Sequence, residues 1–220
     1  MTDPKTVNSN QTDLHSKLKR NVLRHLGHPF QRPIPDYSLQ VFEQAQERVE
    51  QHKGPLIFDS FCGVGESTVA IAKANPDALV IGLDKSLHRL NKHDQHYQES
   101  GVDNYLLLRA DTDDFWRLAL DANWQLAQHF LLYPNPWPKS SHLQRRCHGS
   151  PLFPTLLSLG GLLELRSNWK LYIEEFVYAL QLAKQQAAVE PYQPETPITP
   201  FERKYLGASQ DLWRCRCILV

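Results

Sequence analysis

The hydrophobic pattern of the chain changes near Gly54. Before that point, residues 1–13 are polar and predict a disordered tail, and a basic, weakly amphipathic segment follows over residues 14–26. After a proline-broken loop, apolar side chains recur at helical spacing, which predicts a helix capped by Asp36. The pattern therefore divides the chain into an N-terminal extension, residues 1–53, and a domain over residues 54–220.

Beyond residue 54, short apolar runs alternate with amphipathic stretches. We expect strands over 56–59, 79–84, 105–109, 130–133, 162–166 and 212–219, and helices over 66–74, 86–99, 112–120, 152–159 and 169 to about 184. A proline-rich loop is expected over residues 191–200. Repeated strand–helix units predict an α/β domain whose mostly parallel sheet is covered by helices on both faces.

Composition places the chain among ordinary globular proteins. Of its 220 residues, 41% are hydrophobic and 22% are charged. No apolar run approaches the roughly 20 residues that a membrane span needs, and the N-terminus has no apolar signal core. The four cysteines and ten histidines show no metal-ligand spacing. We therefore expect a cytoplasmic protein without a metal site or membrane attachment, and we favour a monomer.

The formal net charge is zero, which argues mildly against a nucleic-acid binder, but the basic residues cluster at 15–24 and 139–146. The second cluster follows an apolar run that ends in Pro134-Asn-Pro-Trp-Pro138. An amide beside a large aromatic suits a flat nitrogenous substrate, and the basic residues behind them suit phosphate. This segment predicts chemistry on a nucleobase within a nucleic acid.

A glycine-containing loop follows the first predicted strand. Asp59 ends this strand, and Gly63 and Gly65 let the backbone turn sharply before a helix with free N–H groups. Asp84 and Asp111 end the next two strands, at the sheet edge where α/β proteins bind ligands. Together these features predict a nucleoside cofactor. The loop lacks the G-K-[ST] ending of an ATP-binding loop, but it does not decide between a dinucleotide and S-adenosylmethionine.

Five motifs give the chain a family resemblance. They are D-x-x-x-G-x-G-x-S at 59–67, IGLD at 81–84, YPNPWPKxxHxxRR at 133–146, GGxLELRSNWxxYxEE at 160–175 and TPFERK at 199–204. In this order, from about Leu56 to the C-terminus, they resemble the bacterial tRNA (guanine-N7)-methyltransferases. The resemblance implies a class I methyltransferase, with a Rossmann-like, mostly parallel seven-stranded sheet that ends in a C-terminal antiparallel hairpin. It also implies S-adenosylmethionine as cofactor and tRNA or another RNA as partner.

The resemblance also implies roles for individual residues. The cofactor would be bound by Asp59, Gly63, Gly65, Asp84 and Asp111. The candidate catalytic residues around the target base are Asn135, Asn168 and Glu202. Further substrate contacts would come from Trp137, Lys139, His142, Arg145, Arg146 and Thr199. In this scheme the Lys139, Arg145 and Arg146 side chains hold phosphates, and the Trp137 ring shapes the base pocket.

The chain departs from the family pattern at three positions. Phe61 replaces a loop glycine, and Asn135 and Asn168 stand where the family carries aspartate. Guanine N7 carries no proton, so its methylation needs no general base and depends mainly on alignment of the reactants. An asparagine still accepts a hydrogen bond, though a neutral and weaker one. The leading hypothesis is therefore a tRNA (guanine-N7)-type methyltransferase. The alternatives are a methyltransferase acting on another nitrogen and a non-catalytic paralogue that binds RNA or protein.

Overall fold

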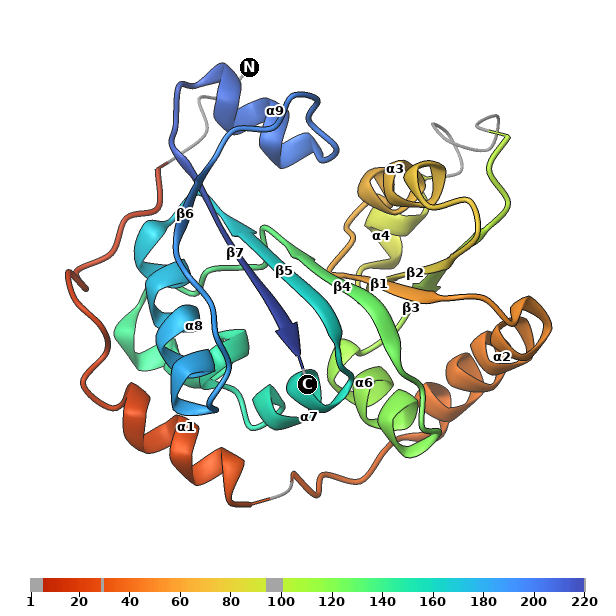
Figure 1. Ribbon diagram of the computed structural model, residues 1–220, viewed down its shortest axis with the longest axis horizontal. Coiled ribbons are helices and arrows are strands. Elements are labelled where there is room, and N and C mark those ends of the chain that lie inside the picture. Colours follow the sequence, from red (N-terminus) through yellow and green to blue (C-terminus); the bar gives the residue numbers. More distant parts are fainter. Residues whose placement is uncertain (1–5, 29, 94–100, 220) are drawn as a thin grey trace. The chain divides into compact units, whose positions relative to one another are not determined.

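The computed structural model describes residues 6–28, 30–93 and 101–219 (Figure 1). The strands are β1 (Leu56–Ser60), β2 (Leu79–Asp84), β3 (Tyr105–Arg109), β4 (Leu126–Leu132), β5 (Gly161–Ser167), β6 (Glu190–Tyr192) and β7 (Leu212–Leu219). They form one seven-stranded sheet in the order β3-β2-β1-β4-β5-β7-β6. Strand β1 pairs in parallel with β2 and β4, β2 pairs in parallel with β3, and β6 pairs antiparallel with β7. The predicted mostly parallel sheet with an antiparallel C-terminal pair is confirmed.

The described helices are α1 (Leu18–Leu26), α2 (Asp36–His52), α3 (Glu66–Ala74), α4 (Leu87–Leu90), α6 (Thr112–Asp121), α7 (Phe153–Ser158), α8 (Lys170–Leu182) and α9 (Pro200–Gly207). Two expectations differ from this list. The helix predicted over 86–99 is described only as α4, and residues 94–100 lie outside the described part. The proline-rich segment contains β6 and leads into α9, which the sequence did not predict. Pro200 suits the first turn of a helix because its φ is already helical and no N–H is needed there.

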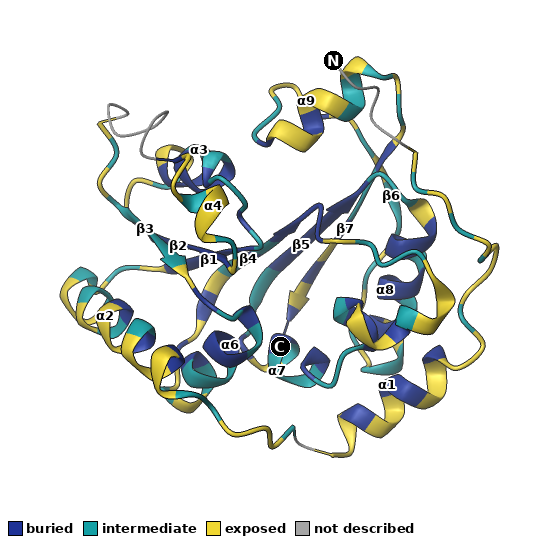
Figure 2. Cartoon of the chain, turned by 180° about the vertical axis from the view of Figure 1, so that it is seen from behind, coloured by how far each residue is buried: buried dark blue, intermediate teal, exposed yellow. Residues whose placement is uncertain are grey.

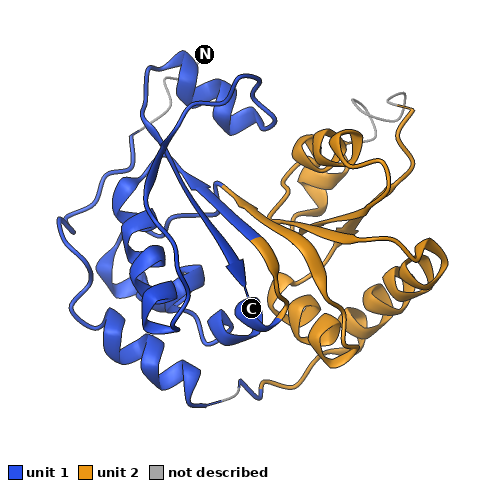
Figure 3. Cartoon of the chain, viewed as in Figure 1, with its two compact units in different colours: residues 1–31, 133–158, 163–220 blue, residues 32–132, 159–162 orange. Residues whose placement is uncertain are grey.

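The chain folds into two compact units, whose segments interleave along the sequence (Figure 3). Unit 1 consists of Met1–Gln31, Tyr133–Ser158 and Leu163–Val220, and unit 2 consists of Arg32–Leu132 and Leu159–Leu162. This division differs from the boundary predicted at residue 53, because α1 and α2 belong to different units. It also assigns the glycine loop to unit 2 and the PNPWPK segment to unit 1.

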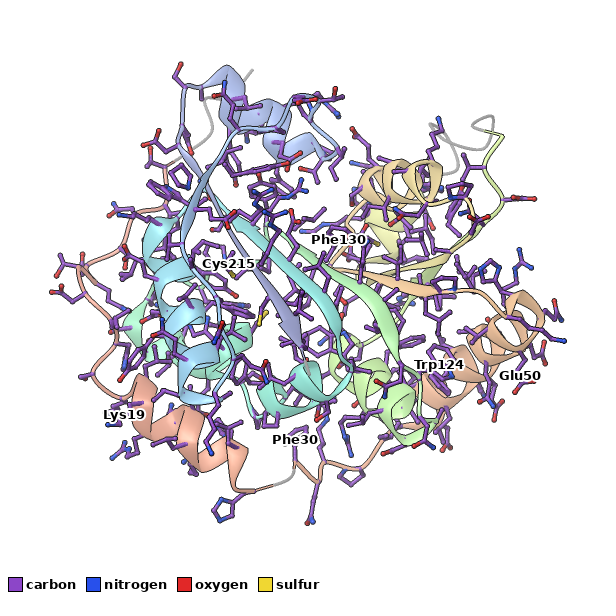
Figure 4. The ribbon with its side chains drawn as sticks, in the orientation of Figure 1. Lys19, Phe30, Glu50, Trp124, Phe130 and Cys215 are labelled. Atoms are coloured by element: carbon purple, nitrogen blue, oxygen red, sulfur yellow. The ribbon has the colours of Figure 1, made fainter. Side chains whose placement is uncertain are left out.

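Unit 2 is built around the fully buried strands β1 and β2. Helices α3 and α4 lie on one face of β1–β3, and α2 and α6 lie on the other (Figure 1). Four aromatic rings pack together here: Phe42 from α2, Phe115 from α6, Phe58 from β1, and Trp124. The centroids of the contacting rings are 4.8–6.3 Å apart, and Trp124 is labelled in Figure 4. Burial of each such side chain stabilises the fold by about 1.5–3 kcal/mol. This core fixes β1 and β2, and therefore the loops at their carboxyl ends.

Unit 1 has its own core, in which α1 packs against α7 and α8, and α8 packs against β7. The buried side chains gather on the strands and on the inner faces of the helices, whereas α9 exposes most of its residues (Figure 2). Residues 6–13 differ from the disordered tail that their composition predicts. Ser9 Oγ donates to the carbonyl of Pro138 at 2.7 Å, and Gln11 Nε2 donates to Glu175 Oε1 at 2.6 Å. Polar side chains thus attach this segment to the rest of unit 1 through buried partners that local composition does not reveal.

Candidate functional site

Asp59 joins β1 to the helix that follows the glycine loop. Its Oδ2 accepts hydrogen bonds from Ser67 Oγ at 2.6 Å and Thr68 Oγ1 at 2.7 Å, both in the first turn of α3. The Asp59 side chain is fully buried. Direct contact with a bound cofactor, which the resemblance implies, does not fit a side chain without exposed surface. Asp59 instead holds the loop in shape, because it fixes the start of α3 against the end of β1.

The two loop glycines meet different constraints. Both have positive φ, +63° at Gly63 and +77° at Gly65. A Cβ on Gly65 would lie 2.5 Å from Leu107 Cδ1, so Gly65 is required by close packing against β3. A Cβ on Gly63 would meet no atom within 4 Å. Gly63 therefore borders open space at the end of β1, where a ligand can approach the backbone.

Phe61 occupies the loop position where the family resemblance implies glycine. Its φ of +65° lies in the left-handed region, which costs an L-residue roughly 1–2 kcal/mol. The Phe61 ring packs edge-on against Trp116, with centroids 6.1 Å apart. The loop thus keeps a glycine-like backbone at a non-glycine residue, and the ring contact offsets part of the strain.

Two carboxylates follow the neighbouring strands β2 and β3. Asp84 Oδ2 accepts the Gly63 N–H at 3.0 Å, and its Oδ1 accepts the Ser86 N–H at 2.8 Å. Asp111 caps α6 through the Asp113 N–H at 3.0 Å and pairs with Lys85 Nζ at 3.0 Å. The Oδ2 oxygens are more heavily used, because Asp84 Oδ2 also accepts from Arg89 at 3.4 Å and Asp111 Oδ2 also pairs with Arg32 at 3.5 Å. The Oδ1 atoms of both carboxylates therefore keep a second lone pair for a ligand hydroxyl. Gly63, Asp84 and Asp111 in unit 2 therefore fit the nucleoside part of S-adenosylmethionine, with Gly63 supplying the open approach.

The PNPWPK turn, in unit 1, is held by unusual backbone geometry. Tyr133, just before the turn, has a φ of +54°, and Trp137, within it, has a φ of +47°. Asn135 Oδ1 accepts the Trp137 N–H at 3.2 Å, and Asn135 itself is exposed. Non-glycine residues in left-handed conformations persist only where the surroundings enforce them, and they concentrate at functional sites. The turn leaves the Asn135 amide nitrogen facing solvent as a hydrogen-bond donor.

The ring of Trp137 contacts two of the other residues that were predicted to bind substrate. The Arg145 guanidinium lies over it at 4.7 Å from the centroid, and the His142 ring meets it edge-on at 5.4 Å. Lys139 and Arg145 are exposed. Partial burial, together with the positive charges of Arg145 and Lys139, lowers the pKa of His142. We call Trp137, Lys139, His142 and Arg145 the Trp137 cluster; it combines an aromatic face with exposed cations.

Arg146, predicted to hold phosphate, has a different environment. It is fully buried, and its guanidinium donates to Glu175 Oε2, to Gln11 Oε1 at 3.1 Å and to the Trp137 carbonyl at 3.2 Å. The predicted phosphate contact does not fit this environment, because a buried, fully engaged guanidinium has no surface for a phosphate. Arg146 instead attaches the turn to α8, and Arg145 alone of the two arginines faces solvent.

Glu175 is the acceptor on which this attachment depends. Burial alone would raise its pKa, but hydrogen bonding from His148, the charge of Arg146 and the His15 N–H lower it to about 2. Burial also lowers the pKa of His148 more than Glu175 raises it, so His148 is neutral and donates from Nε2 at 3.0 Å. The carboxylate is therefore ionised and paired with Arg146.

Thr199 and Glu202 also lie inside unit 1. Thr199 Oγ1 caps α9 by accepting the Glu202 N–H at 3.0 Å. The buried Glu202 carboxylate accepts from Arg166 at 2.8 Å, from the Tyr133 hydroxyl at 3.1 Å and from the Ile198 N–H at 2.8 Å. The predicted contacts of these two residues with the target base do not fit such buried side chains, since Thr199 is 4% exposed and Glu202 has no exposed surface. They position α9 and the start of the PNPWPK turn instead.

Asn168 Nδ2 donates to Gln210 Oε1 at 3.0 Å, so this amide connects the end of β5 to the segment before β7. Among the predicted catalytic residues, Asn135 is exposed, Asn168 is half-buried and Glu202 is buried. No metal-binding group of three or more His, Cys, Asp or Glu side chains occurs within residues 6–28, 30–93 and 101–219. Within the same ranges, no helix has the length and apolar character of a membrane span.

Sequence reasoning missed Tyr133, Arg166, Glu175 and Gln11. Glu175 carried a usable signal, because it is an acidic residue on a helix whose neighbouring positions Tyr172, Phe176 and Leu180 are apolar and buried. A charge in that setting requires a buried partner. The partners themselves come from distant segments, and no local pattern identifies them.

Comparisons with known proteins agree with this architecture. A family model described as "Putative methyltransferase" matches residues 53–215, well over half of the chain. Proteins named tRNA (guanine-N(7)-)-methyltransferase are similar in sequence. The one from Klebsiella pneumoniae is 27% identical over 168 residues, which cover 72% of this chain and 70% of the relative. The one from Nocardioides sp. is 30% identical over 74% of this chain and 66% of the relative, and the one from Pseudomonas aeruginosa is 26% identical over 81% and 78%.

Solved structures show the same fold. The 16S rRNA methyltransferase KamB matches with a TM-score of 0.58 at 18% identity, over 81% of this chain and 94% of that chain. The aminoglycoside resistance methyltransferase NpmB1 matches with a TM-score of 0.57 at 21% identity, over 81% and 93%. The chain therefore belongs to the methyltransferase family that the matching model describes, as a divergent relative of the tRNA (guanine-N(7)-)-methyltransferases.

Proposed function

We propose that the protein transfers a methyl group from S-adenosylmethionine to N7 of a guanine in tRNA. The observation that carries the substrate class is the Trp137 cluster, an aromatic face with exposed Lys139 and Arg145 beside the exposed amide of Asn135. Aromatic rings and guanidinium planes stack on unpaired bases, and cations bind phosphates. The names of the sequence relatives support tRNA as the RNA and guanine N7 as the methylated atom.

The proposed cofactor site consists of Gly63, Asp84 and Asp111. When bound, S-adenosylmethionine supplies an electrophilic methyl group on a positively charged sulfur. The open space beside Gly63 accommodates a ligand, and the Asp84 carboxylate, held by two backbone N–H groups, is oriented to accept hydrogen bonds from ribose hydroxyls. Asp59, behind the loop, keeps Gly63 in place through α3.

At the base, the protein's part is orientation. Guanine N7 reacts through a ring lone pair and loses no proton, so alignment of the base supplies most of the rate enhancement. Asn135 Oδ1 is already used by the Trp137 N–H, which leaves its Nδ2 as the group that faces a substrate. An amide N–H suits the guanine carbonyl O6, whereas an aspartate would accept from the ring N–H. The chain therefore orients the base by donating a hydrogen bond.

The reaction is tested by incubating bulk tRNA with S-adenosylmethionine tritiated on the methyl group. We expect label in the tRNA from the unaltered protein, and a large loss of label with Asp84→Asn. The matched control is Glu50→Gln, an exposed carboxylate on α2 (labelled in Figure 4), which should transfer at the unaltered rate. Binding of the cofactor without transfer to any RNA would overturn the proposal. Since tRNA is the proposed substrate, we further propose that the protein acts in the cytoplasm. We also propose that it acts as a monomer.

Label in another base nitrogen would favour a second candidate, a methyltransferase with a different ring-nitrogen target. The observation in its favour is the Asn135 donor itself, because a neutral amide does not select the guanine ring N–H as an aspartate would.

A further inference from the structure

Three aromatic rings meet on the inner side of α9 in unit 1. Phe201 and Tyr205 lie one helical turn apart, and their rings are stacked with centroids 6.1 Å apart and an interplanar angle of 25°. The Tyr133 ring lies 6.5 Å from Phe201 and 5.7 Å from Tyr205. Tyr133 is buried, whereas Phe201 is 43% exposed. We call these three residues the aromatic platform; its base is fixed in the fold and its outer ring faces solvent.

The hydrogen-bond network beneath the platform holds it rigidly. The Tyr133 N–H donates to the Arg166 carbonyl at 3.0 Å, and its hydroxyl donates to Glu202. Glu202 in turn accepts from Arg166 and from the Ile198 N–H, and Thr199 caps the helix that carries Phe201. Ordering a ligand on such a surface costs little conformational entropy, because the rings are already in place.

The exposure of Phe201 sets it apart from the other phenylalanines of the core. Phe42, Phe58, Phe115, Phe153 and Phe176 are at most 6% exposed. An aromatic ring left in water forgoes the stabilisation that burial of its apolar surface would give, so an exposed, pre-stacked ring is a surface available for a ligand. Its neighbours on α9, Arg203 and Lys204, are both exposed and positively charged. Cations beside an apolar ring complement a base attached to phosphates better than they complement an apolar peptide.

We propose that Phe201 and Tyr205 form a stacking surface for one unpaired base of the RNA substrate, with Arg203 and Lys204 beside the adjoining phosphates. This inference rests on the proposed function, because it takes RNA as the ligand. Stacking on aromatic side chains is the usual way in which proteins hold single-stranded bases, and it tolerates any base because every base has a π-face. The platform would therefore contribute affinity that depends little on sequence or salt.

The test compares tRNA affinity for Phe201→Ala, Phe201→Tyr and the control Ile218→Ala, whose side chain on β7 is 72% exposed. Loss of one base stack weakens binding by about 5- to 150-fold, so Phe201→Ala should fall in this range. Phe201→Tyr keeps a ring and should bind like the unaltered protein, as should Ile218→Ala. Because stacking releases no counterions, Phe201→Ala should keep the slope of log affinity against log salt.

Unaltered tRNA affinity in Phe201→Ala would overturn the inference. Weakened tRNA binding by Phe201→Tyr would also overturn it, provided that this variant keeps the urea midpoint of the unaltered protein and is therefore folded. A smaller salt slope in Phe201→Ala would overturn it too, since the loss would then be ionic. If the unaltered protein binds no tRNA at low salt, the proposed function fails together with the inference. If the unaltered protein binds tRNA and Phe201→Ala binds it equally well, the inference fails and the proposed function stands.

Discussion

Removal of the Arg146 side chain tests the interpretation of this residue as a buried anchor. Arg146→Ala leaves the Glu175 carboxylate buried without its cation, and it also removes the hydrogen bonds to Gln11 and to the Trp137 carbonyl. Breaking a buried ion pair by deleting one partner costs about 3–5 kcal/mol, because an uncompensated charge stays in the interior. We therefore expect the free energy of unfolding to fall by this amount.

Arg145→Ala is the matched control, one residue away. Arg145 is exposed and contacts the Trp137 ring, an arrangement worth about 0.5–1 kcal/mol at the surface. Urea denaturation followed by tryptophan fluorescence gives both free energies. In a chain of this size each kcal/mol lowers the melting temperature by about 2–4 °C, so Arg146→Ala should melt roughly 6–20 °C below the unaltered protein. If the two variants differ by less than about 1 kcal/mol, Arg146 is not the buried anchor described above.

Three further predictions concern single side chains. The folded-state pKa of Glu175 is about 2, against an ordinary 4.5. Its ionised form therefore stabilises the fold by about 3 kcal/mol above about pH 5, and this stabilisation is lost as the pH falls towards 2. Glu175→Gln should therefore show a flatter fall in stability between pH 5 and 2, measured by urea denaturation; an unchanged acid slope would contradict the paired, ionised carboxylate. Gly65→Ala should lower the free energy of unfolding by at least ~2 kcal/mol, because residue 65 has a positive φ and its Cβ would clash with Leu107. The control Gly207→Ala, which has open space around it, should change this free energy by less than about 0.5 kcal/mol, and equal values for the two variants would contradict the packing at the loop. Arg145→Glu should weaken tRNA binding and reduce the salt slope by about 1, measured by filter binding; an unchanged slope would rule out a phosphate contact.

The strands and most helices were predictable because their signals are local. Strands β2, β3 and β7 match the predicted ranges, because β2 and β3 are short, mostly apolar runs and β7 alternates polar with apolar residues. Strand β6 and helix α9 were missed, because β6 is a three-residue edge strand with a proline and α9 has few apolar positions. Both form through pairing and capping, which sequence periodicity does not report.

The candidate site was predictable in its location but only partly in its roles. Motif position alone does not distinguish Arg145, which is exposed, from Arg146, which is buried against α8. Likewise Glu202 lies in the matching motif but is used by Arg166 and Tyr133. The partners of these groups lie far away along the chain, and burial depends on those partners. Sequence identified the segments, and the fold assigned each side chain to the surface or to the interior.

Methyl transfer to guanine N7 of tRNA is identified by the methylated nucleoside that the protein produces. Unmodified tRNA is incubated with the protein and S-adenosylmethionine, digested to nucleosides and separated by chromatography with mass detection. We expect 7-methylguanosine to form with the unaltered protein and to be strongly reduced with Asp84→Asn. Formation of a different methylated nucleoside, or of none by a protein that binds the cofactor, would contradict this expectation.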